Sequence, residues 1–367
     1  MNPNISNISE DGEVYKFTLY NLNVSLANAV RRTILTDIPI NVIKTETYND
    51  NQCNIISNTS RLHNEILKQR LSCIPIHIKE LDLLPGKYVL EVDVTNEKDH
   101  TIFVTTENFK IRNKTNENYL TLEETLKIFP PCKKTNSFID FARLRPKISD
   151  SIPGEELKLT AEFSVGTAKE NSMYNIVSKC SYGNTLDSVK INEYWEQQQN
   201  KLVSEGLSKE EVEFQKKNFY LLDAQRHYVS NSFDFVIQSV GIYENKEIVK
   251  KACIVLQNKF LVMIQAIDSD IVPINNSETT MDYCFDIVLE NEDYTIGKVL
   301  EYLLYEKFYE SEKIFSFCGF KKFHPHNTDS IIRIAYINNS DKNMVRQHLR
   351  NVCIDASDVF KKIYELF

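Results

Sequence analysis

Two stretches of this sequence, far apart in the chain, carry the same pattern of a strand, a short loop and a helix. Large apolar residues alternate with polar ones over residues 15–20, and apolar residues then recur at helical spacing over 26–38. The same alternation and spacing return at 285–289 and 296–308, in step at an offset of 270 residues. Two common units could coincide by chance, but agreement at every position favours an internal duplication.

The ends of the two expected helices carry matching residues. Ser25 in the first stretch and Thr295 in the second are suited to N-cap positions, because a hydroxyl oxygen can accept a bond from the first free N–H groups. Pro39 disfavours the α conformation at Ile38, so the first helix is expected to stop there.

Composition narrows the class of protein. With 367 residues the chain is expected to form two or three units, and 42% hydrophobic with 26% charged residues is ordinary for a globular protein. A net charge of −8 disfavours a free-standing nucleic-acid binder, and only 9 glycines disfavour glycine-rich nucleotide loops. The 8 cysteines form no Cys-x-x-Cys pair. Without a signal peptide or a long apolar run, a soluble intracellular protein is expected.

Between the repeats, the pattern predicts further elements. Residues 41–48 read as a strand, 59–71 as a helix, 88–106 as a hairpin and 157–163 as another strand.

The second part of the chain begins with a polar helical stretch at 185–222, followed by a strand at 233–237. Long helices with one apolar stripe are predicted at 246–267 and 345–366, separated by a linker at 268–281. Each stripe could pack on its own sheet, or the two could pack on each other as a pseudo-dimer within one chain, and the pattern leaves both readings open.

Few residues suggest chemistry. Arg31 and Arg32 are adjacent on the first repeat helix and point about 100° apart, so one can face a partner while the other lies near the core.

His324 and His326 lie near Cys318, but the intervening proline restricts the backbone and no fourth ligand is evident, so a loop between two strands is the better reading.

The combination of these segments resembles the alpha-like assembly subunits of multisubunit RNA polymerases. Residues 25–39 and 61–76 are similar to the two conserved helices of that family, and residues 153–175 and 232–241 resemble the later part of the third subunit of eukaryotic RNA polymerase II. Residues 289–304 and 317–336 are similar to the small eleventh subunit, and the archaeal D and L subunits and the bacterial alpha subunit are further relatives.

The resemblance implies an α+β fold with two alpha-subunit-type dimerisation domains packed as an intramolecular pseudo-dimer. The first, third-subunit-like domain would comprise residues 1–76 and 154–267, interrupted by an inserted subdomain at 77–153 and carrying the polar excursion at 185–222. The second, eleventh-subunit-like domain would comprise 282–367, after the linker at 268–281.

The resemblance also implies a non-catalytic assembly platform, with no catalytic residues of its own. Its partners would be the two largest polymerase subunits and other subunits, with DNA contacted only through the complex and no homodimer or membrane required. Arg31 and Arg32 would contact a large subunit. The facing residues of the pseudo-dimer would be Leu26, Ala27, Val30, Ile34, Ile296, Gly297, Val299, Leu300 and Leu303. Many relatives bind a metal through cysteines of the inserted subdomain, which here holds only Cys132, so no metal or cofactor is expected.

Three alternatives stay open. The chain could be the equivalent subunit pair of a polymerase I or III type enzyme, a metal-dependent enzyme using His324 and His326, or a transcription factor binding DNA through Arg31 and Arg32. The fused arrangement is also similar to that of large DNA viruses of eukaryotes, which would place the polymerase complex in the nucleus, the cytoplasm, a virion or a viral factory.

Overall fold

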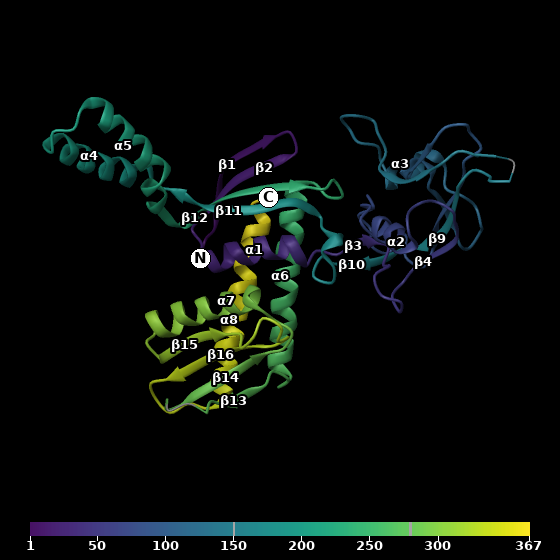
Figure 1. The fold of residues 1–367 in the computed structure, drawn as a ribbon. Coiled ribbons are helices and arrows are strands. Elements are labelled where there is room, and N and C mark those ends of the chain that lie inside the picture. Colours follow the sequence, from purple (N-terminus) through teal and green to yellow (C-terminus); the bar gives the residue numbers. More distant parts are fainter. Residues whose placement is uncertain (150, 279–280) are drawn as a thin grey trace. The chain divides into compact units, whose positions relative to one another are not determined.

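A computed structural model describes residues 1–149, 151–278 and 281–367 (Figure 1). The chain divides into two compact units. The first unit comprises Met1–Thr33, Lys179–Gln238 and Val249–Phe367, and the second comprises Ile34–Ser178 and Ser239–Ile248.

The first unit begins with a four-stranded sheet of order β1-β2-β12-β11, in which β2 pairs antiparallel with both β1 and β12. Its elements are β1 (Asn4–Asp11), β2 (Val14–Tyr20), α1 (Val24–Thr36), β11 (Val177–Leu186), β12 (Tyr228–Ser239) and α6 (Asn245–Asp268). Apolar side chains of β2 and β12 meet across the ladder, where Phe17 lies opposite Phe235 and their rings stack with centroids 5.1 Å apart.

The last part of the first unit repeats this arrangement. Its elements are β13 (Ile274–Asn276), β14 (Cys284–Leu289), α7 (Tyr294–Leu304), the π-helical turn η4 (Tyr305–Ser311), β15 (Phe315–Lys321), β16 (Ser330–Tyr336) and α8 (Lys342–Glu365). The sheet order is β13-β14-β16-β15, so the strands follow the same path as β1-β2-β12-β11. Both α6 and α8 are 24 residues long. The duplication expected from the sequence is therefore present in the topology, with β2 and β14, and likewise α1 and α7, starting 270 residues apart.

A helical excursion interrupts the first copy between β11 and β12. It consists of α4 (Ser188–Ser204), α5 (Lys209–Leu221) and the short 3-10 helix η3 (Asp223–Arg226), which confirms the polar helices predicted at 185–222. A small core of its own holds the excursion together, formed by Ile191, Trp195, Phe219 and Ala224. Ser208 caps α5 through a reciprocal capping box with Glu211.

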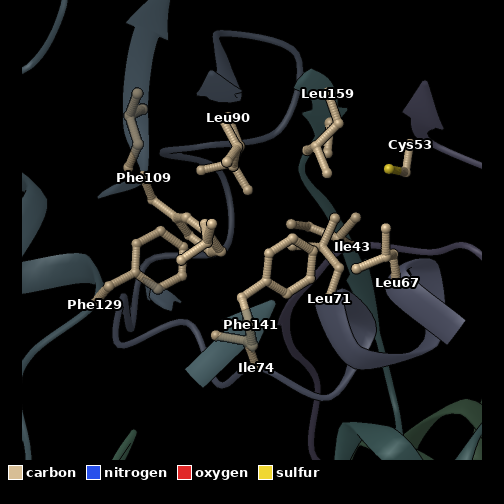
Figure 2. Close-up of a cluster of buried hydrophobic side chains, with 14 of the residues drawn as sticks. Ile43, Cys53, Leu67, Leu71, Ile74, Leu90, Phe109, Phe129, Phe141 and Leu159 are labelled. Carbon is tan, nitrogen blue, oxygen red and sulfur yellow. The ribbon is translucent and has the colours of Figure 1, made fainter. Parts of the chain in front are cut away.

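In its described residues, the second unit contains three small sheets and two short helices. Its elements are β3 (Ile40–Val42), β4 (Cys53–Asn58), α2 (Asn64–Ser72), β5 (Tyr88–Thr95), β6 (Ile102–Thr105), η1 (Thr106–Asn108), β7 (Lys110–Asn113), α3 (Leu122–Ile128), β8 (Asp140–Leu144), β9 (Glu156–Glu162), β10 (Ser164–Gly166) and η2 (Ser172–Tyr174). The sheets have the orders β4-β9-β5-β7, β6-β8 and β3-β10. Figure 2 shows part of its core, where Phe109, Phe129 and Phe141 pack edge to face beside aliphatic side chains from α2, β5 and β9.

The hairpin predicted at 88–106 is wrong. β5 and β6 are strands, but β5 pairs with β7 and β9, whereas β6 pairs with β8. The turn that separates them contains Asn96, which is buried. Its side chain donates to the carbonyl oxygens of His100 and Leu144, and its N–H donates to that of Glu155. These bonds direct the chain away from β5. They involve residues distant in sequence, which the periodicity of a strand cannot reveal.

Two further expectations in this unit need correction. The strand predicted at 41–48 is limited to β3, and the helix predicted at 59–71 begins only at Asn64. The delay has a local cause, because the Asn58 side chain accepts from Ser60 N at 3.0 Å and donates to Leu62 O at 2.8 Å. Such side-chain bonds stabilise a turn in competition with helix.

The helix caps of the two repeats also differ from expectation. Ser25 does not cap α1, and Thr295 does not cap α7. Instead, the N–H of Ser25 donates to Asn23 Oδ1 at 2.9 Å, and the N–H of Thr295 donates to Asp293 Oδ1 at 2.8 Å. Asn and Asp are strong N-caps because their side-chain oxygen reaches the N–H two residues ahead. The capping residues again lie 270 positions apart.

The predicted domain boundaries can be compared with these units. The inserted subdomain expected at 77–153 forms part of the second unit, which also takes in 34–76 and 154–178. The linker expected at 268–281 contains β13, the counterpart of β1. Residue 150 of the expected insertion and residues 279–280 of the expected linker lie outside the described residues.

Candidate functional site

The first unit brings the two repeat helices into direct contact through Arg32. Its Nε donates to Thr295 Oγ1 at 2.8 Å, and its Nη2 donates to Asp293 Oδ2 at 2.6 Å. Both charged side chains are about one-third exposed. Asp293 thus caps α7 with one carboxylate oxygen and binds Arg32 with the other, so the N-terminus of α7 is joined to the side of α1.

Arg31 lies in different surroundings. Its Nε donates to Asn28 Oδ1 one turn earlier on α1, at 3.0 Å. Burial raises the pKa of Cys180 on β11 to about 12, and the nearby positive charge of Arg31 acts in the opposite direction. Arg31 is half-buried beside this strand, and its contacts differ from those of Arg32, as expected for adjacent helix positions that lie about 100° apart. Contact of either arginine with a large subunit stays a prediction.

The apolar residues expected at the pseudo-dimer interface are buried. Those on α1 are at most 1% exposed and those on α7 at most 7%: Leu26, Ala27, Val30, Ile34, Ile296, Val299, Leu300 and Leu303. Each fully buried side chain of this size contributes roughly 1.5–3 kcal/mol. Which of them face each other stays a prediction.

Gly297 needs a different explanation from close approach of two helices. A Cβ atom at this position would lie 2.0 Å from Cε2 of Phe320 on β15, within the same half of the chain. The glycine therefore makes room for an aromatic ring of its own sheet. Whether Gly297 also faces the other half of the pseudo-dimer stays a prediction, because the helical pattern does not report which neighbour covers a small residue.

The long helices of the two halves run antiparallel along each other (Figure 1). Phe260 of α6 stacks on Phe360 of α8 with centroids 5.9 Å apart, and both are fully buried. Asp268, at the end of α6, accepts a bond of 2.8 Å from Arg350 near the start of α8. The sequence left open whether each apolar stripe packs on its own sheet or against the other half. At these residues the two halves contact each other.

Phe367, two residues after the end of α8, also reaches the first sheet. The ring of Phe367 lies 4.9 Å from that of Phe17 and 6.4 Å from that of Tyr15, both on β2. Sequence reasoning missed Phe367, and it also missed Asp293 and Asp268. Asp293 could have been found by aligning the caps of the two repeats, whereas the pairing of Phe367 with β2 leaves no trace in local periodicity.

The histidine loop offers no metal cluster in the described part of the chain. His324 and His326 are exposed between β15 and β16, with ring centroids 4.9 Å apart. Nδ1 of His324 accepts the N–H of His326 at 3.2 Å. Among the described residues, no group of three or more His, Cys, Asp or Glu side chains is placed to hold a metal ion.

No helix in the described ranges is long and apolar enough to span a bilayer.

Comparison with known proteins gives one family. The model of the RNA polymerase Rpb3/Rpb11 dimerisation domain matches residues 16–260, more than half of the chain. No curated protein matches the sequence. The matched range contains α1 and most of β2 and α6, elements that contact the last part of the chain. The chain therefore belongs to the Rpb3/Rpb11 dimerisation-domain family of RNA polymerase subunits, which associate with other polymerase subunits in transcription.

Proposed function

We propose that this chain is a non-catalytic assembly platform of a multisubunit DNA-directed RNA polymerase, in which both partners of the dimerisation unit are joined in one polypeptide. The third-subunit-like half would end with α6, and the eleventh-subunit-like half would begin near β13. The two halves would pack as an intramolecular pseudo-dimer, so no second copy of the chain would be needed.

The observation that carries this proposal is the bond from Arg32 to the capped end of α7. It joins equivalent helices of two topologically equivalent halves, and the rings of Phe260 and Phe360 join their long helices. Two copies of one fold that bury matching elements against each other have the organisation of a dimer. The family match supplies the polymerase context.

The partners of the platform would be the two largest subunits. Arg31 is the better candidate for their contact, since Arg32 already binds Asp293 within the chain. A guanidinium group suits protein interfaces because its planar fork recognises carboxylates. The fused arrangement, together with a composition rich in Asn, Lys and Ile, supports an origin in a large DNA virus of eukaryotes and a polymerase complex inside the host cell.

The test is affinity purification of the tagged full chain from its native source, with mass spectrometry of the proteins that elute with it. We expect two very large polymerase subunits, and their loss from Arg31→Glu while the thermal unfolding curve stays unchanged. Lys216→Glu on the exposed side of α5 is the matched charge-reversal control and should retain both subunits. Elution of the wild-type chain alone from native extract would refute the proposal.

A further inference from the structure

The sheet β13-β14-β16-β15 has an outer face, directed away from α7. On its inner face Phe320 pairs with Ile332, and the Phe320 ring lies against Gly297 of α7. Side chains alternate along a strand, so the odd-numbered positions of β15 from 317 onwards point to the outer face. These are Phe317, Gly319 and Lys321, which pair with Ala335, Arg333 and Ile331 on β16.

The β15 side of this outer face exposes aromatic rings. Phe317 is 39% exposed, and Phe323, in the loop after β15, is 60% exposed. A Cβ atom at Gly319 would lie 2.9 Å from Cζ of Phe317, so the Phe317 ring extends along the strand over the glycine. Farther along the face, Cys284 and Ala335 are buried. The accessible part is therefore β15 with the loop that follows it.

Positive charge accompanies these rings. Nζ of Lys321 lies 4.3 Å from the centroid of the Phe323 ring, and Lys322 lies between them in sequence. In the described residues, neither ammonium group forms an ion pair. Arg333 on the neighbouring strand binds Asp286 through two bonds of 2.7 and 2.8 Å, so the acid on this face is neutralised.

The loop between β15 and β16 adds further polar groups. His324 and His326 are exposed, and imidazole rings can both stack on bases and donate to phosphate oxygens. Asp329 is the acid of this loop, and its Oδ1 accepts the N–H of Asn291 at 3.1 Å. Residues 321–329 thus carry two lysines against one engaged carboxylate, in a chain whose net charge is −8.

The combination of rings and cations selects the class of ligand. Single-stranded nucleic acid is bound where bases can stack on exposed rings while phosphates meet basic side chains. A duplex is disfavoured, because its bases are already stacked on each other. An acidic peptide would use the lysines but would leave the phenylalanine rings without stacking partners. Under the proposed function the strand is RNA, since a DNA-directed RNA polymerase releases its product as a single strand.

We propose that the outer face of β15 and the loop after it bind single-stranded RNA, with bases stacked on Phe317 and Phe323 and phosphates held by Lys321 and Lys322. The choice of RNA rests on the proposed function, whereas the site itself rests on the geometry of the sheet. The binding involves none of the residues that join the two repeats.

The test uses the purified full chain and a fluorescent oligouridine of about twelve nucleotides, measured by fluorescence anisotropy. We expect saturable binding at low salt that weakens about thirtyfold or more in Phe317→Ala/Phe323→Ala, because two stacking contacts are lost. The matched control, Phe103→Ala/Phe214→Ala, removes two exposed phenylalanines elsewhere and should bind like the wild type. Thermal unfolding shows which variants are folded.

A single substitution keeps the stacking contact testable if the double variant does not fold. Phe323→Ala changes only the exposed loop and should weaken binding about fivefold or more. Phe323→Trp should bind at least as tightly as the wild type, because a larger ring still stacks.

A second measurement tests the charge. Lys321→Gln/Lys322→Gln should reduce the steepness with which the logarithm of the binding constant falls with the logarithm of salt concentration by about 1.4, because each lysine that binds a phosphate releases about 0.7 counterion from a single strand. Lys216→Gln/Lys217→Gln, two exposed lysines of α5, is the matched control and should leave this slope unchanged.

Four results would each overturn the proposal: no saturable binding at low salt, equal affinity in a folded phenylalanine variant, an unchanged salt slope in the lysine variant, or equal affinity for the oligouridine annealed to oligoadenosine. Tighter binding of the corresponding deoxy strand would overturn the choice of RNA, and displacement of the RNA by a lower concentration of an acidic peptide would assign the surface to a protein partner. The purified chain contains no other subunit, so RNA binding can fail while the large subunits are still recovered with the tagged chain.

Discussion

The bond between Arg32 and Asp293 predicts a measurable coupling between residues from opposite halves of the chain. Exposed ion pairs contribute about 0.2–1 kcal/mol, and hydrogen bonds to charged groups about 1.5–3 kcal/mol. Both side chains are about one-third exposed, and Arg32 also donates to Thr295. We therefore expect a coupling free energy between these limits, about 1–2 kcal/mol.

A double-mutant cycle isolates this term. Arg32→Ala should lower the free energy of unfolding by about 1.5–2 kcal/mol, and Asp293→Ala by about 1 kcal/mol more than that, because it also removes the cap of α7. The double variant should lose less than the sum by the coupling free energy. Urea unfolding of the four proteins gives the values, and added salt should reduce the coupling.

A control cycle shows that the assay can detect such a term. Asp286 and Arg333 form a bidentate pair between β14 and β16 within one half of the chain, with bonds of 2.7 and 2.8 Å. Their coupling should appear whether or not the halves pack together. A coupling below about 0.3 kcal/mol for Arg32 and Asp293, beside a clear value for the control, would refute the contact.

Three further perturbations have definite expected outcomes. Gly297→Ala should lower the free energy of unfolding by about 1–3 kcal/mol, because the new Cβ overlaps the Phe320 ring. In a Phe320→Ala background the same change should raise that free energy by up to about 1 kcal/mol, because alanine has the higher helix propensity. A change of the same sign in both backgrounds, measured by urea unfolding, would contradict this. Phe360→Ala should cost about 3–5 kcal/mol of unfolding free energy, and a loss below about 1 kcal/mol would mean that α6 and α8 do not pack as described. Burial lowers the pKa of His348 below its ordinary value of 6.5, so the unfolded chain binds the proton first and stability should fall as the pH drops below about 6.5. His348→Gln can still accept from the Tyr336 hydroxyl, and it should remove that part of the pH dependence of the melting temperature. An unchanged pH profile of the melting temperature would contradict this.

The sequence was informative where one segment determines its own structure. The 270-residue offset located β2 with α1 and β14 with α7, and the polar stretch at 185–222 formed the expected helices. The apolar spacing of the two long helices also marked their extent. Periodicity and composition are local properties, so they predict elements well.

The remainder depended on partners distant in sequence. The separation of β5 from β6 follows from bonds that Asn96 makes to segments about fifty residues later, and the small size of Gly297 follows from Phe320 on another element. Arg32 was singled out, but its acidic partner was not, because nothing in the local sequence identifies Asp293 as the residue it reaches. Likewise, Arg61 and Arg70 line one pocket of the second unit together with Arg143 and Arg145, which lie far from them in sequence.

The most direct test of the pseudo-dimer is to cut the chain between its halves. A protease site inserted between Ile271 and Val272 separates β1 through α6 from β13 through α8, and leaves only contacts between the halves to hold the fragments together. We predict that the two cleaved fragments elute together in size-exclusion chromatography at the volume of the intact chain, and that the cut Phe360→Ala variant separates more readily. Separation of the wild-type fragments at micromolar concentration, with each still folded by circular dichroism, would contradict the account.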